Sequence, residues 1–179
     1  MAVAGAGKKL AWSNYTEVAQ GKPGPTPNSV ISAGTAVGID ADWGKDYTTA
    51  GGKNTVKLVD IKVSITLGEL WVVKGTKSDA LLAHEQGHYR IEELAAKELE
   101  AKLKAISVTM DSLNDASTEA QKQGDDAFAA MSKLGDELQD LYDSAPPKGT
   151  NHGLDATAQT SWTLKMTAAA SATALKAAV

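Results

Sequence analysis

The chain has 179 residues, a formal net charge of −4 and no cysteine. This length allows one domain with a substantial core, and the acidic balance disfavours nucleic acid and anionic lipid, which bind basic surfaces. The absence of cysteine excludes disulfides, thiol catalysis and thiolate metal sites, so nitrogen and oxygen atoms must hold any metal.

Residues 10–77 are predicted to form mainly strands and loops. Apolar and polar residues alternate in Val59–Leu67, the period-two pattern of a strand with one buried face. A similar alternation runs through Ile31–Ile39, and Leu70–Val73 follows an expected turn at Gly68. These segments predict an antiparallel sheet.

Two further stretches of this region are predicted to interrupt the strands. Gly21–Asn28 contains prolines, which cannot join the centre of a hydrogen-bonded ladder, so we expect a loop. Gly51–Gly52 predicts a turn.

Residues 78–143 are predicted to form a helical hairpin, because apolar residues recur there every three or four positions. The first helix is expected to begin with Ser78 or Asp79 as its N-cap, and the second near Asn114 or Asp115. Residues 144–179 are predicted to form a proline-containing loop followed by a C-terminal helix.

The segment Leu81–Arg90 reads LLAHEQGHYR and carries the spacing HExxH within the first predicted helix. Residues four apart on a helix differ by about 40° and about 6 Å, so the rings of His84 and His88 can reach one metal ion. Glu85 points about 100° away from His84, which suits a general base beside the metal rather than a ligand. The pattern therefore predicts a zinc site on the inward face of this helix.

A catalytic zinc site usually has a third protein ligand. His152 is the one histidine outside the pair, and we expect it to be that ligand. Glu92 is too far along the helix from His84 and is expected in a supporting or surface position. The alternative is an acid of the second helix, such as Glu119, Asp125, Asp126 or Glu137, and the sequence does not choose among these acids.

Several segments together resemble a bacterial family of predicted secreted zinc-dependent proteases, catalogued as domain of unknown function number nine hundred and twenty-two. The resemblance covers roughly residues 10–165. It rests on the following motifs: Leu10–Tyr15 as an opening strand, the strand around Trp71 leading into Leu81–Tyr89, Tyr142–Asp143, His152–Gly153, Gln159 and Trp162. Where the family has Asp-Phe, this chain has Asn14-Tyr15, and its Tyr-Asp and His-Gly elements stand further apart.

The resemblance implies a zincin-like peptidase fold and a secreted or periplasmic location. It also implies that His84 and His88 bind zinc, that Glu85 is the catalytic acid-base, and that His152 is the third ligand.

We therefore expect the whole chain, residues 1–179, to be a single α+β, zincin-like domain in which an antiparallel sheet packs against the two long helices. The predicted function is zinc-dependent hydrolysis of peptide bonds in a peptide or protein substrate, with Glu85 as general acid-base. Tyr142, or alternatively Tyr89, is expected to donate a hydrogen bond to the oxyanion. The Leu70–Val73 strand is expected to be a sheet edge on which the peptide lies.

The alternative function is that of a non-catalytic interaction protein. In that case the acidic helical hairpin binds a partner, and the histidines hold a structural metal or none. Neither nucleic acid nor a membrane is expected as a partner, since the chain has no basic surface and no run of the roughly 18 to 20 apolar residues that span a bilayer.

Overall fold

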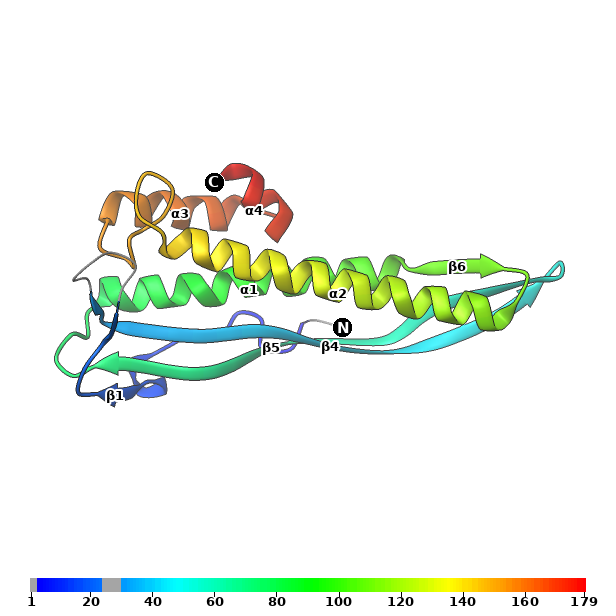
Figure 1. Cartoon of the computed structure of the whole chain (residues 1–179), viewed down its shortest axis with the longest axis horizontal. Helices are drawn as coiled ribbons and strands as arrows, with labels where there is room; N and C mark the ends of the chain where they lie inside the picture. The colour runs from blue at the N-terminus through cyan, green and yellow to red at the C-terminus, as the bar shows by residue number, and fades with distance from the viewer. Residues whose placement is uncertain (1–2, 24–29) are drawn as a thin grey trace.

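The computed structural model describes residues 3–23 and 30–179 of the chain. It is an elongated α+β molecule in which two long helices lie along a sheet (Figure 1). The helices are α1 (Asp79–Ala105) and α2 (Leu113–Asp143), and the long strands beneath them are β4 (Ala33–Ala50) and β5 (Lys53–Val73). None of the helices in the described part of the chain combines the length and the apolar character needed to cross a membrane.

The sheet is mixed, which corrects the expectation of an antiparallel one. β5 pairs antiparallel with β4 and with β6 (Ser107–Met110), but parallel with β1 (Thr16–Val18). The parallel pair arises because the chain crosses from β1 to β4 before it returns along β5. A separate small pair joins β2 (Lys22–Pro23) to β3 (Val30–Ile31).

The predicted turns have different outcomes. The turn at Gly51–Gly52 is confirmed and joins β4 to β5. The turn at Gly68 is wrong, because β5 runs through this residue without a break. The predicted loop 21–28 lies mostly outside the described residues.

The Leu70–Val73 segment is not a sheet edge. β1 and β4 pair with this part of β5 on its two sides: Trp71 lies opposite both Thr16 and Gly34. Among the described strands, the outer ones at this end of the sheet are β1 and β4.

The opening motif also differs from its expected structure. Trp12–Asn14 forms a short 3₁₀ helix, η1, and the first strand begins only at Thr16. Asn14 closes this turn because its side-chain carbonyl oxygen accepts a hydrogen bond from the Ala11 N–H at 2.9 Å.

The alternation of buried residues along β5 shifts its phase at two places, near Asp60 and between Leu67 and Leu70, and the pairing with β4 changes register at both. Leu58 and Ile61 are both buried although they are three residues apart, which strict alternation would forbid. Asp60 between them has φ of 51°, and the pairing of β4 with β5 changes register at the same place, between Asp42 and Gly44. This bulge explains why the regular period predicted for Val59–Leu67 holds only from Ile61 onward.

The helices begin at capping side chains. Ser78 accepts a hydrogen bond from the backbone N–H of Leu81 at 3.1 Å, which confirms the predicted start of α1. Ser112 caps α2 in the same way. The single C-terminal helix expected after Asp155 is instead two helices, α3 (Ala156–Ala168) and α4 (Ala172–Ala178).

Both ends of the helical hairpin are fixed by apolar packing. Towards the β4–β5 turn, Leu99 and Leu103 of α1 pack with Val56 of β5. At the other end, α3 and α4 lie on the side of α1 and α2 away from the sheet, where Trp162 and Leu175 pack against Leu138 (Figure 1). This packing holds the start of α1 and the end of α2 beside each other.

Candidate metal centre

Three ligand-type atoms converge where α1 begins and α2 ends. The Nε2 atoms of His84 and His88 are 3.2 Å apart. Oδ1 of Asp143, the last residue of α2, lies 3.1 Å from the first and 3.2 Å from the second. Both rings are buried and the carboxylate is mostly so, which makes this a cluster of polar atoms away from bulk water.

Two glutamines hold the histidine rings from behind. The Nδ1 atom of His88 lies 2.5 Å from Oε1 of Gln139, and that of His84 lies 3.2 Å from Oε1 of Gln159. Each amide is oriented by its NH₂ group: Gln139 donates to the backbone oxygen of His88, and Gln159 donates to the hydroxyl of Tyr142. Because an amide oxygen only accepts, both histidines carry their proton on Nδ1.

When both rings are neutral, their Nε2 atoms therefore present lone pairs to each other and to the Asp143 carboxylate. Oδ1 of Asp143 is buried and has no hydrogen-bond donor among the described residues. Three acceptors in mutual contact repel one another unless a cation lies among them. Atoms about 2.0 to 2.1 Å from a tetrahedral zinc are about 3.3 Å apart, so these residues fit such an ion.

Without a metal ion, a proton on His88 supplies the positive charge of the cluster. Burial lowers the pKa of His88, but Asp143 outweighs this effect and raises that pKa to about 9. For Asp143, burial raises the pKa of the carboxyl, yet its contacts with His152, His84 and His88 hold it well below the usual range. The carboxylate thus stays ionised and attracts a positive charge, whether a proton or a metal ion.

His152 reaches the cluster from a strained turn. Asn151 and His152 have φ of 51°, and Gly153 has φ of 75°. A Cβ atom at Gly153 would lie 2.9 Å from Cβ of His84, so only glycine fits there. The turn brings Nδ1 of His152 to 3.3 Å from Oδ2 of Asp143, and ligand-type atoms of His84, Asp143 and His152 lie within 4.8 Å of one another.

Glu85 lies beside the cluster and is also buried. Its Oε2 atom accepts a hydrogen bond from the hydroxyl of Thr35 in β4 at 2.6 Å. Tyr15, just before β1, is 2.6 Å from the same hydroxyl and donates to it, because the one Thr35 proton goes to Glu85. This chain of hydrogen bonds fixes the carboxylate next to the histidines and leaves its other oxygen available.

The hydroxyl groups of Tyr142 and Tyr89 both donate to backbone oxygens, whereas an oxyanion donor must donate to the substrate. Tyr142 is completely buried, and its hydroxyl donates to the backbone oxygen of His84 at 3.2 Å. It occupies the space where a side chain at Gly87 would stand, which explains the glycine of HEQGH. Tyr89 donates to the backbone oxygen of Gly5. Both hydroxyls therefore support the backbone, and this placement does not favour an oxyanion role.

The other candidate acids lie away from the cluster. Glu119 and Asp125 hydrogen bond to glutamines of α2, Asp126 pairs with Lys122, and Glu137 pairs with Lys176. Glu92 takes the supporting position expected for it, since Gln139 donates to its Oε1 at 3.1 Å.

The sequence reasoning missed Asp143, Gln139, Gln159 and Thr35 as site residues. Asp143 and Gln159 belong to the motifs of the family resemblance, and this was the available signal for them. Gln139 lies four residues before Asp143, so both face the same side of α2, and this spacing was a second signal. Nothing in the sequence distinguishes Thr35 from its neighbours in the strand.

An open cleft of about 280 Å³ gives access to the cluster. Its wall opposite the histidines is the stretch 33–36 of β4. The backbone N–H of Val73 donates to the oxygen of Ser32, so by the alternation of an antiparallel ladder the backbone groups of Ala33 and Thr35 face away from β5. No described strand pairs with that side of β4.

Comparison with known proteins places the chain in a family. Residues 11–136 match the family model described as "Bacterial protein of unknown function (DUF922)", and the chain belongs to this family. The match includes His84, Glu85 and His88 and ends before Asp143 and His152. No curated protein and no solved structure matches the chain significantly.

Proposed function

We propose that the protein is a zinc-dependent peptidase with a zincin-like arrangement of its catalytic residues. The observation that carries this proposal is the convergence of three ligand-type atoms, the Nε2 atoms of His84 and His88 and Oδ1 of Asp143, beside the buried carboxylate of Glu85. Two histidines and a carboxylate form a common ligand set for catalytic zinc.

His84, His88 and Asp143 hold the ion in this proposal. Zinc, when bound there, polarises a carbonyl group and lowers the pKa of a water molecule toward neutrality. The contact of His152 with Oδ2 of Asp143 gives it a supporting role, and its ligand-type atom is also close enough to those of His84 and Asp143 to join the ligand set. That His152 is itself a ligand stays a prediction of the sequence.

Glu85 accepts a proton from the attacking water and passes it to the nitrogen of the leaving amine. Thr35 keeps Glu85 in place by donating to Oε2, and Tyr15 keeps Thr35 in place in turn. Their hydrogen bonds hold the free oxygen of Glu85 on the cleft side.

The free edge of β4 favours a peptide as the substrate. A peptide in extended conformation can pair with the outward backbone groups of Ala33 and Thr35, which form one wall of the cleft. The non-catalytic alternative has less support, because acids of α2 such as Asp126 are paired along their own helix.

The test has a metal arm and an activity arm. The chain purified without chelator should contain about one zinc ion by elemental analysis, and Asp143→Ala should weaken zinc binding more than His152→Ala does. Glu85→Gln should retain zinc and the fold while hydrolysis of a mixed peptide library falls by at least about a hundredfold, as expected for loss of a general base. A Glu85→Gln variant with full activity would exclude this mechanism.

A further inference from the structure

A second groove opens from the metal centre on the side of His152. It has a volume of about 380 Å³, within the range of about 300 to 1,000 Å³ typical of sites for small ligands. This groove and the cleft adjoin, since they share four lining residues: Ile31, Ala33, Glu85 and His152. The groove is walled mainly by apolar residues: Val30, Ile31, Ala80, Leu81, Leu154 and Ala156.

The charge of the groove differs from that of the other end of the cleft. Among the described residues that line the groove, the ionisable ones are Glu85 and His152, both already part of the candidate site. At the opposite end Lys22 and Glu69 form an ion pair at 3.3 Å, and the Lys22 ammonium lies over the ring of Trp71. An uncharged group of a ligand is therefore favoured in the groove but not at the Lys22–Glu69 end of the cleft.

The rim of the groove exposes large apolar side chains. Val30 is 61% exposed and Leu154 is 77% exposed, and both line the groove. They come from separate segments, β3 and the turn that carries His152. Apolar surface that flanks a concave apolar site gains free energy when a ligand covers it.

We propose that this groove is the specificity pocket of the enzyme, and that it binds a large aliphatic or aromatic side chain of the peptide next to the bond that is cut. The occupant follows from the place of the groove beside the site, because a peptide paired with Ala33 and Thr35 projects its side chains to either side of the edge of β4. The inference rests on the proposed peptidase function and adds its substrate class.

The first experiment compares two leucines that are similarly exposed. Leu154→Asp places a carboxylate on the rim, and Leu164→Asp is the matched control, since Leu164 is 67% exposed on α3 and does not line the groove. The zinc-loaded chain is given a peptide library, and the cut sites are read by mass spectrometry. We expect a large apolar residue at one position beside the cut, and a loss of about 10- to 200-fold in kcat/KM for such peptides in Leu154→Asp only.

The second experiment needs no hydrolysis. Leucine hydroxamate and glycine hydroxamate share one metal-binding group, and calorimetry measures their binding to the zinc-loaded chain. Burial of the leucine side chain should make its hydroxamate bind about 10- to 100-fold more tightly, and Leu154→Asp should reduce this difference.

The two experiments separate the possible failures. If no peptide is cut but the leucine compound binds more tightly, the peptidase function fails and the groove stands. If peptides are cut without an apolar preference and the two hydroxamates bind equally, the specificity pocket is wrong and the peptidase function stands.

Discussion

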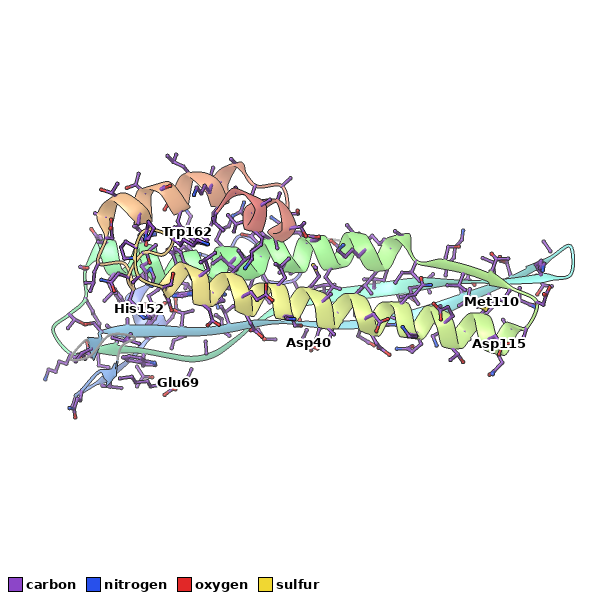
Figure 2. All side chains as sticks on the ribbon, turned by 45° about the horizontal axis from the view of Figure 1, so that its top comes forward. Asp40, Glu69, Met110, Asp115, His152 and Trp162 are labelled. Carbon is purple, nitrogen blue, oxygen red and sulfur yellow. The ribbon has the colours of Figure 1, made fainter. Side chains whose placement is uncertain are left out.

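The two ends of this elongated molecule are built in opposite ways. Figure 2 shows His152 at one end, the site end, and Met110 and Asp115 near the other, the hairpin end, where β4 turns into β5. The buried polar side chains of the described residues belong to the first half of α1 or to the loop after α2: His84, Glu85, His88, Glu92, Glu93 and Thr150. The core of the hairpin end is apolar.

One helix thus serves two purposes along its length. The first half of α1 buries groups that cost free energy unless they are paired, whereas its second half buries Leu99 and Leu103 and contributes stability. Substitutions at the hairpin end should therefore change stability without changing the metal centre, whereas substitutions at the site end should act through its buried polar groups.

The largest expected effect is at the hairpin end. Leu99 is fully buried in the apolar cluster, so Leu99→Ala should lower the free energy of unfolding by about 2 to 5 kcal/mol, measured by urea denaturation. Zinc affinity of the folded variant should stay unchanged. Leu164→Ala, at an exposed position, is the control and should have little effect on stability. A large loss of zinc affinity in Leu99→Ala would break the separation.

The next effect is a pH dependence at the site end. Burial raises the pKa of Glu92 from 4.5 to about 7, and the negative Asp136 nearby adds to the shift. Between these values the folded chain binds more protons than the unfolded chain, so stability falls as pH rises from about 4.5 to about 7 and stays lower above it. The loss is on the order of 3 kcal/mol.

Glu92→Gln tests this effect because glutamine has no proton to lose and keeps an oxygen for Gln139. Urea denaturation of the metal-free variant should show higher stability than the unsubstituted chain at pH 8 and nearly equal stability at pH 4.5. Equal stability of the two chains at pH 8 would contradict the prediction.

The smallest effect concerns Gln139 and should appear only in metal binding. Gln139→Met keeps the shape of the side chain but removes the acceptor for Nδ1 of His88, so zinc affinity should fall about 10- to 100-fold in competition with a chelator. Gln123→Met, on the same helix but exposed, is the matched control and should bind zinc normally. If both variants bind zinc alike, Gln139 does not position His88.

Local sequence signals predicted the helices better than the sheet. Ser78 and the spacing of apolar residues mark the start of α1, because capping and helical periodicity depend on near neighbours. The parallel pairing of β1 with β5 depends on residues far apart in the chain, and no local pattern encodes it. The phase shift at Asp60 is likewise a tertiary feature that strict alternation cannot express.

In the candidate site too, the contacts within one helix could be predicted from the sequence, and those between helices could not. His84, Glu85 and His88 are brought together by a single helix, so their spacing was sufficient to predict their proximity. His152 was expected near these residues and lies there. Its ion-pair contact is with Asp143, a residue that the HExxH spacing could not identify. The position of Asp143 depends on how α1 and α2 pack, since it reaches the histidines only from the neighbouring helix.

The place of Asp143 at the end of α2 has one more electrostatic consequence. The peptide dipoles of a helix add up to a partial negative charge of about half an electron at its C-terminus. α2 has no basic residue in its last turn to offset this charge, and Asp143 adds a full negative charge at the same point. The end of the helix therefore favours a doubly charged ion over a single proton, and a bound divalent cation neutralises the helix terminus as well as the carboxylate.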